Sequence, residues 1–278
     1  MSSLARLLER SRFELLPTKG AGEAAVHLPA GTTVTVTASP RRGLDRTIAV
    51  AAELEDLGFH AVPHLSARLV RGPDDLSRIL GRMRELGLTE AFVIGGDAPE
   101  PLGPYSSAIE LLAAMAESGE GPARIGVGAY PEGHPLIDAS ALVRALLAKQ
   151  AYASYMATQI CFDPRQIGAW LADVRARGVT LPAYIGIPGA VERTKLFEIS
   201  LRVGVGDSLR FLRKQGGVVT QLLRRRAYNP DLLAMAIAQL SADGADVGIA
   251  GFHVYTFNQV ERTAAWRARL ISSVGAPA

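Results

Sequence analysis

Glu14 is the clearest candidate for proton transfer in this sequence. It stands in the apolar run Phe13-Glu14-Leu15-Leu16, so the sequence predicts a carboxyl group surrounded by apolar side chains. Burial penalises the charged carboxylate and favours the protonated form that a general acid needs. Because charged residues are seldom buried without a partner or a task, a structural carboxylate paired with Arg12 or Arg68 is the alternative. The sequence leaves both interpretations open.

A second acidic candidate, Asp97, follows two glycines in Val93-Ile94-Gly95-Gly96-Asp97. Glycine allows a backbone to come close to a flat ligand, and Asp97 could accept hydrogen bonds from ring nitrogens or ribose hydroxyls. Aspartate after glycine is also common in turns and at helix caps. The motif is weak on its own.

The most distinctive stretch is Gly128-Ala129-Tyr130-Pro131-Glu132-Gly133-His134-Pro135. Its two prolines restrict the backbone around Glu132 and His134, and Tyr130 offers an aromatic face and a hydroxyl group. We interpret this as a rigid ligand-binding loop, with a structural role for His134 as the alternative.

Amide, imidazole and hydroxyl groups occur in three further apolar runs. Gln159 could give one donor and one acceptor to a pterin-like heterocycle, although a core glutamine bonded to neighbouring backbone has the same sequence signature. His64 stands in Pro63-His64-Leu65-Ser66, and His253 and Tyr255 stand in the run 252–258. All three are expected near the same ligand site.

Eight short apolar runs alternate with segments of helical periodicity, such as Leu44–Leu57 and Asp74–Leu86. The runs are Phe13–Leu16, Thr32–Thr37, His60–His64, Ala91–Ile94, Ile125–Ala129, Met156–Cys161, Ala183–Ile187 and Ile249–Tyr255. This pattern predicts a (β/α)8 TIM barrel, in which chemistry collects at the carboxyl ends of the strands. Further helices are expected over residues 191–201, 207–215 and 230–242.

Length and composition indicate one domain over residues 1–278, with a short helix over residues 4–10 before the barrel. The 278 residues are 48% hydrophobic and carry a net charge of +3, and the basic triplet Arg224–Arg226 is expected on a solvated helix face. We therefore predict no nucleic-acid partner.

Several other classes of protein fit poorly. Cys161 is the only cysteine, which excludes an internal disulfide and favours a buried structural thiol. The five histidines show no HExxH pattern, so no metal site is predicted. We expect a cytoplasmic protein, since there is neither a signal-peptide core nor a membrane span. The sequence does not indicate an oligomeric state.

With these clusters assembled, the chain resembles the methylenetetrahydrofolate reductase family over nearly its whole length. The matching pieces follow the family's order, and the tyrosine-proline to histidine-proline segment is the most specific. They are Phe13-Glu14, Thr35-Val36-Thr37, Pro63-His64-Leu65-Ser66, Gly96-Asp97, residues 129–135, Thr158-Gln159 with Phe162-Asp163, and residues 252–258.

The resemblance implies an oxidoreductase that passes hydride between NADH or NADPH and folate-bound one-carbon units through bound FAD. Glu14 looks like the general acid, and Asp97 like a catalytic carboxylate near flavin and pterin. Gln159 and Tyr255 look like further contacts of the tetrahydrofolate substrate. The positions that match the cofactor site are Thr37, His64, Gly96, Asp97, Ala129, Tyr130, His134 and Lys149.

The chain departs from the family pattern at three places. Gly95 stands where the family usually has arginine, residues 15–18 lack the usual aromatics and paired prolines, and only Lys149 is left as a phosphate contact in 148–151. Two alternatives therefore stay open. One is a flavin-independent reductase in which nicotinamide delivers hydride directly, and the other is a folate-binding regulatory protein without turnover.

Overall fold

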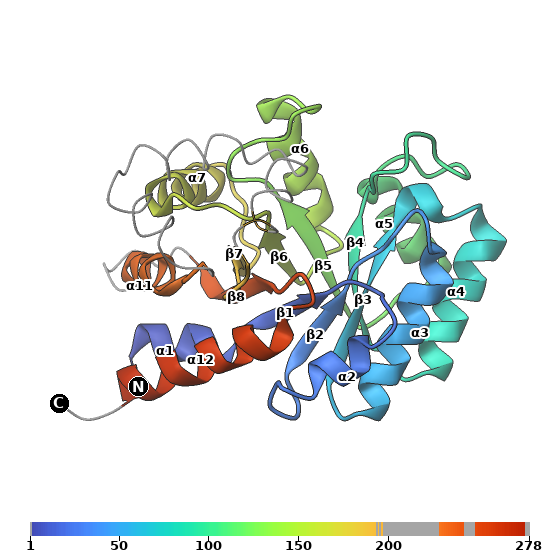
Figure 1. Cartoon of the computed structure of the whole chain (residues 1–278). Helices are drawn as coiled ribbons and strands as arrows, with labels where there is room; N and C mark the ends of the chain where they lie inside the picture. The colour runs from blue at the N-terminus through green and yellow to red at the C-terminus, as the bar shows by residue number, and fades with distance from the viewer. Residues whose placement is uncertain (1, 193, 195, 197–227, 242–247, 276–278) are drawn as a thin grey trace.

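The computed structural model describes residues 2–192, 194, 196, 228–241 and 248–275. Eight parallel strands close into a barrel in sequence order, and β1 pairs with both β2 and β8 (Figure 1). The strands are β1 (Arg12–Leu15), β2 (Thr33–Val36), β3 (His60–Ser66), β4 (Glu90–Ile94), β5 (Arg124–Ala129), β6 (Tyr155–Thr158), β7 (Ala183–Pro188) and β8 (Ile249–Tyr255). The predicted (β/α)8 barrel is confirmed.

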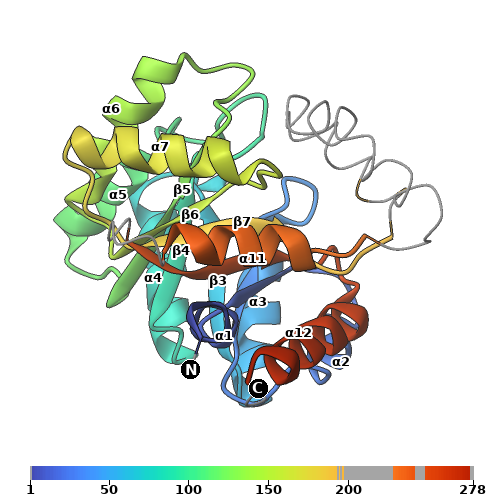
Figure 2. The ribbon, with the colours of Figure 1, turned by 90° about the vertical axis from the view of Figure 1, so that its left-hand side faces the viewer.

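Helices surround the barrel on the outside (Figures 1 and 2). They are α1 (Ser3–Glu9), α2 (Ala21–Ala25), α3 (Gly43–Asp56), η1 (Ala67–Leu69), α4 (Pro73–Glu85), α5 (Ala108–Ser118), α6 (Ala139–Gln150), α7 (Pro164–Ala176), α11 (Asp231–Leu240) and α12 (Val260–Gly275). The expected helix over 230–242 corresponds to α11. Most of 191–201, all of 207–215 and the Arg224–Arg226 triplet lie outside the described residues.

The predicted N-terminal helix is α1. Ser2 caps it, because its side chain accepts a hydrogen bond from the backbone N–H of Ala5 at 3.2 Å. The helix packs against α12, α11 and β8, and it lies beside α12 in both ribbon views (Figures 1 and 2). Its buried Leu4, Leu7 and Leu8 join the core outside the barrel.

Strand alternation divides the core into two parts. Phe13 and Leu15 are fully buried in the large apolar cluster between strands and helices. Their neighbours Arg12 and Glu14 alternate with them, so they face the barrel interior. A separate apolar cluster built on Val62, Phe92, Tyr155 and Ala157 fills part of that interior. The rest of the interior is polar, and this division positions the groups described below.

An ion pair closes the barrel at the amino ends of its strands. Arg12 donates a hydrogen bond to Glu90, and both side chains are buried. The guanidinium of Arg12 also lies over the rings of Tyr155 and Tyr184, at 4.0 and 4.4 Å. Glu90 contacts His60 Nε2 at 2.9 Å. Buried charges need such partners because the barrel interior cannot solvate them.

Gly126 makes room for this ion-pair network. A Cβ atom at that position would lie 2.2 Å from the Tyr155 ring, which is a steric overlap. Arg12 Nη1 donates a hydrogen bond to the Tyr155 hydroxyl at 2.9 Å. The glycine in β5 is therefore explained by the aromatic ring that β6 places over it.

The sixth strand ends earlier than expected. The predicted run was Met156–Cys161, but β6 ends at Thr158. Ile160, Cys161 and Phe162 are nevertheless buried, because they pack into the core after the chain leaves the sheet. The apolar run therefore indicated which residues are buried, but only its first part forms a strand. The thiol of Cys161 is buried, as expected.

Candidate active site

The carboxyl group of Glu14 is held by a histidine at the mouth of the barrel. Its Oε2 atom lies 3.2 Å from His253 Nε2 and 3.9 Å from His64 Nε2. The Glu14 side chain is 14% exposed, whereas both histidines are almost fully buried. One side of the carboxyl group therefore contacts imidazoles and the other is open to the mouth.

The arginine partners considered for Glu14 from sequence are wrong. Arg12 faces Glu90 at the other end of the barrel. Arg68 donates to the backbone carbonyls of Ala98, Pro99 and Ser106. Two residues along a strand advance the chain by about 6.6 Å, so Arg12 and Glu14 belong to different layers of the same interior.

His64 lies beside the acid as a neutral imidazole. Burial lowers its pKa from the ordinary value of 6.5 to about 4, and the opposing influence of the nearby Glu14 charge is smaller. The ring packs on Phe92 with centroids 4.7 Å apart. Its Nε2 atom is buried and has no hydrogen-bond partner among the described residues. His64 therefore adds no positive charge next to Glu14 at neutral pH.

Gln159 and Tyr255 lie at the same end of the barrel. The Tyr255 hydroxyl donates to the Thr158 carbonyl at 3.0 Å, and its ring meets His253 edge-on at 4.9 Å. Gln159 Oε1 accepts from the backbone N–H of Ile160 at 2.9 Å, which is the local bonding considered as an alternative. Its side-chain NH2 group makes no hydrogen bond within the described part of the chain. Gln159 can therefore donate to a ligand without breaking a contact.

Tyr130, His134 and Asp97 form the opposite rim. The rings of Tyr130 and His134 meet edge-on at 5.3 Å, and His134 Nδ1 accepts from the backbone N–H of Leu136 at 3.2 Å. Burial raises the pKa of Tyr130, and the nearby charge of exposed Asp97 raises it further. The Tyr130 hydroxyl therefore stays protonated near an open carboxylate, and can donate.

Tyr255 links this rim to the acid. Burial raises the pKa of Tyr255 well above the ordinary value, and the neighbouring Glu14 and Tyr130 raise it further. Glu14, Asp97, Tyr130, Gln159 and Tyr255 thus share one end of the barrel, as expected from their positions at strand ends.

Arg68 organises the loop that carries Asp97. Its Nε, Nη1 and Nη2 atoms donate to the carbonyls of Ala98, Ser106 and Pro99 at 2.6, 3.2 and 2.7 Å. Its backbone N–H also donates to Gly95 at 3.0 Å. The planar guanidinium is suited to several simultaneous hydrogen bonds in fixed directions. The sequence did not point to this role for Arg68.

We expect Arg68→Lys to loosen this loop. A single ammonium group cannot reach three divergent carbonyls, and the loss of about two hydrogen bonds should raise local amide exchange by roughly 10-fold. Hydrogen-exchange mass spectrometry over residues 95–106 measures this change. Arg71→Lys is the matched control, because the Arg71 side chain is exposed. Equal exchange in the two variants would show that Arg68 does not hold the loop.

The remaining predicted cofactor positions, Thr37, Ala129 and Gly96, lie at or near the mouth and differ in their surroundings. Thr37 is half-buried just after β2, and Ala129 is buried at the end of β5. A Cβ atom on Gly96, which has a φ of +97°, would overlap the hydroxyl of Ser66 at 1.9 Å. The close approach at Gly96 is therefore to Ser66 in β3.

Lys149 is buried in α6 and donates to the carbonyl of Gly128 at 2.7 Å. Burial lowers its pKa from 10.5 to about 8. This bond uses one of the three N–H donors of the ammonium group, and the side chain is buried, so a phosphate would contact it only by reaching into the core. Among the described side chains at the positions that the resemblance assigns to flavin, the ammonium group is that of Lys149, and its burial leaves no exposed ammonium or guanidinium group there for the phosphates of FAD. Tyr130 and His134 do offer aromatic surface.

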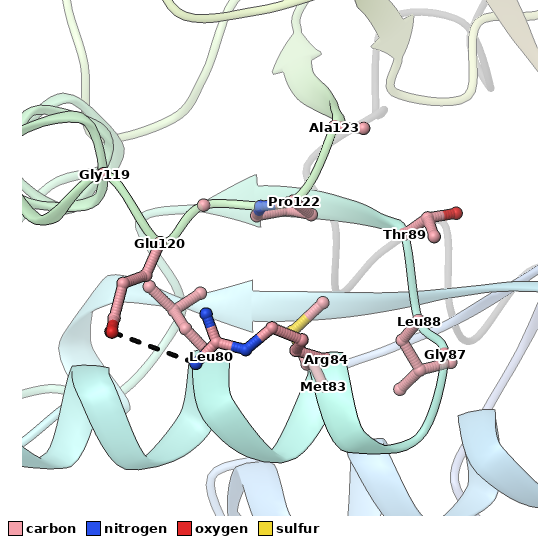
Figure 3. A pocket seen from close by; sticks show the side chains of 11 residues that line it. Leu80, Met83, Arg84, Gly87, Leu88, Thr89, Gly119, Glu120, Pro122 and Ala123 are labelled. Carbon is pink, nitrogen blue, oxygen red and sulfur yellow. Dashed lines mark ion pairs between the residues drawn. The ribbon is translucent and has the colours of Figure 1, made fainter.

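A hollow of about 240 Å³ lies elsewhere, against the carboxyl-terminal parts of α4 and α5 (Figure 3). Thr89 and Ala123 line it just before β4 and β5, so it is at the amino ends of the strands. An ion pair between Arg84 and Glu120 at 3.8 Å spans it. No buried acid or base lines this hollow, so the better candidate site is the mouth at the carboxyl ends of the strands.

The described residues contain no cluster of three or more histidine, cysteine, aspartate or glutamate side chains that could hold a metal ion. Within the same residues, no helix has both the length and the apolar character needed to cross a membrane.

A family model described as methylenetetrahydrofolate reductase matches residues 21–270. The chain belongs to the methylenetetrahydrofolate reductase family. Membership of this family supports an oxidoreductase with a folate substrate. It is consistent with a mouth at which Glu14, Asp97 and Gln159 lie at the same end of the barrel. The match covers most of the chain, so the resemblance noted from the strand-end motifs is confirmed.

Solved structures resemble the chain in fold. One is a putative phosphonomutase from Burkholderia cenocepacia J2315, with a TM-score of 0.50 and 12% identity, covering 99% of this chain and 96% of the other. Another is a putative lyase/mutase from the same organism, with a TM-score of 0.50 and 15% identity, covering 99% and 87%. At such low identity these similarities concern the barrel fold alone.

Proposed function

We propose that this protein transfers hydride between NAD(P)H and the folate one-carbon unit, interconverting 5,10-methylenetetrahydrofolate and 5-methyltetrahydrofolate. The observation that carries the proposal is the carboxyl group of Glu14 in a chain of this family. It is bonded on one side to buried His253 and open on the other to the mouth where Asp97 and Gln159 also lie. Such a carboxyl group suits general-acid catalysis.

Glu14 would give its proton to the folate nitrogen that leaves the methylene carbon, so that the C–N bond breaks and a cationic iminium forms. Hydride then adds to that carbon and completes the methyl group. Asp97, as an open carboxylate, would stabilise the positive charge on the folate. Gln159 would orient the pterin through its unused NH2 group. In the oxidising direction, Glu14 would accept the proton instead.

The family resemblance adds bound FAD, which supplies a two-electron relay between nicotinamide and folate when it is present. The second candidate is direct transfer from nicotinamide to the folate. The burial of Lys149 against the Gly128 carbonyl, together with Gly95 in place of an arginine, favours this flavin-independent route. Both candidates use the same acid.

A visible absorption spectrum of the purified protein, followed by single-turnover mixing, tests the proposal. A yellow protein that NADH or NADPH bleaches and methylenetetrahydrofolate recolours supports the FAD relay. A colourless protein that oxidises NAD(P)H only when methylenetetrahydrofolate is present supports direct transfer. A protein that binds folate but shows no redox turnover in either direction would contradict both, and would favour a regulatory folate-binding protein.

A further inference from the structure

The contact between His253 and Glu14 joins the two strands that close the barrel. β1 and β8 are paired with Arg12 opposite His253 and Glu14 opposite Tyr255. His253 Nε2 therefore reaches diagonally to Glu14 Oε2, at 3.2 Å. The His253 side chain is 2% exposed, so the imidazole has no access to bulk water that could replace this contact.

The surroundings of His253 fix which nitrogen carries the proton. Nε2 faces a carboxyl oxygen, whereas Nδ1 is buried with no hydrogen-bond partner among the described residues. Leaving a buried N–H donor without a partner costs more free energy than leaving the lone pair of a ring nitrogen without a donor. The neutral ring therefore carries its hydrogen on Nε2 and donates to Oε2 of Glu14.

The ring itself is held by aromatic neighbours. Tyr255 meets it edge-on at 4.9 Å, and Phe92 stacks near it with centroids 6.0 Å apart. Tyr255 is anchored in turn by its bond to the Thr158 carbonyl. These contacts leave the imidazole little freedom to turn away from Glu14.

His64 does not duplicate this contact. Its Nε2 atom is 3.9 Å from the same oxygen, which is beyond hydrogen-bond distance. Within the described residues, the other oxygen, Oε1, accepts no hydrogen bond. Of the two imidazoles, only His253 can therefore orient the carboxyl group.

We propose that His253 is the positioning residue of Glu14: its Nε2–H bond to Oε2 points Oε1 at the barrel mouth and stabilises the carboxylate that proton transfer leaves behind. This inference rests on the proposed function for the role of Glu14 as acid. The proton that reaches the substrate comes from Glu14, and His253 keeps its own proton throughout. The hydrogen bond strengthens as charge develops on Oε2, so it stabilises the transition state more than the ground state.

Two substitutions separate this role from simple packing. His253→Leu removes the donor, and we expect kcat to fall on the order of 10- to 100-fold, as for a lost hydrogen bond to a charged group, with KM changed less than about 3-fold. His253→Gln keeps an N–H donor near the position of Nε2, and should recover kcat to within about 5-fold of wild type. His27→Gln is the control, since His27 is exposed. Equal loss of kcat in the Leu and Gln variants, tracking equal losses in thermal stability, would overturn the proposal.

Proton NMR tests the contact without any substrate. A buried imidazole N–H bonded to a carboxyl group should give a downfield, slowly exchanging signal that is lost in His253→Leu, shifted in Glu14→Ala and unchanged in His27→Gln. If this signal is present but no folate turnover is found, the pairing stands and the proposed function fails. If folate turnover is found but the signal is absent or independent of Glu14, the positioning role fails.

Discussion

Glu14→Gln is expected to lower kcat for the folate reaction by about 10²- to 10⁴-fold, the range that general acid catalysis contributes. Glutamine keeps the size of the side chain and can still meet His253 Nε2, but it has no acidic proton to give to the folate nitrogen. Because the substitution leaves packing intact, folate affinity and the thermal midpoint should stay close to those of the wild type. Steady-state kinetics and equilibrium folate titration measure the two effects separately.

Glu117→Gln is the matched control for this substitution. Glu117 is exposed on α5, so the same change of charge there should leave kcat unaltered. If Glu14→Gln turned over folate as fast as Glu117→Gln, Glu14 would not be the acid. If it instead lost folate affinity and stability in parallel, the carboxylate would serve binding or folding.

The barrel could be predicted from sequence because each strand carries its own local signal. Apolar runs bounded by glycine, proline and polar residues recur along the chain, and eight of them alternate with helical periodicity. Once the barrel is inferred, a residue that follows the carboxyl end of a strand is expected at the mouth of the barrel. This is why Glu14, Asp97, Tyr130 and Gln159 could be expected at one mouth before any contact was known.

Partner identity could not be predicted in the same way. Whether Glu14 meets Arg12, Arg68 or His253 depends on which strands are neighbours and on their register, and these are set by closure of the whole barrel. The sequence signal that was available is the period of two: Arg12 and Glu14 face inward on β1, as His253 and Tyr255 do on β8. Only the observed register shows that His253 reaches Glu14.

The ends of apolar runs were a weaker guide. Burial continues through Cys161 after β6 has ended at Thr158, because the chain packs into the core outside the sheet. Lys149 shows the same limit for a charged residue. The phosphate contact of Lys149 stays a prediction from its place in the motif order, and that order gave no sign that its stem is buried and its ammonium group donates to the Gly128 carbonyl.

Arg12→Met should destabilise the folded protein by about 3–5 kcal/mol, the usual cost of leaving one member of a buried ion pair uncompensated. Glu90 would keep its buried charge, and the groups left beside it would be the more exposed His60 and Arg124, at 2.9 and 3.7 Å. The stacking of Arg12 on Tyr155 would be lost as well. Chemical denaturation at neutral pH measures the change in the free energy of unfolding.

The double variant Arg12→Met/Glu90→Leu is the control, because it removes both charges and fills much of the same volume. Replacing both members of a buried pair with apolar side chains is often neutral or stabilising, so the double variant should recover most of the stability lost in Arg12→Met. If it were as unstable as the single variant, the loss would come from packing and not from the unpaired charge of Glu90.

The dependence of stability on acidic pH gives an independent test of the Arg12–Glu90 ion pair. Burial alone would raise the pKa of Glu90, but the hydrogen bond from His60 and the charge of Arg12 outweigh it and lower the pKa from 4.5 to about 2. Since the pKa is lower in the folded state, the pair stabilises the fold above pH 4.5, and this contribution is lost as the pH falls from 4.5 toward 2. The wild type should therefore lose stability steeply across that interval, and the double variant, which has no carboxylate there, should lose less. Parallel pH profiles would mean that other carboxylates control acid unfolding, and that closure of the barrel end does not depend on the charge of Glu90.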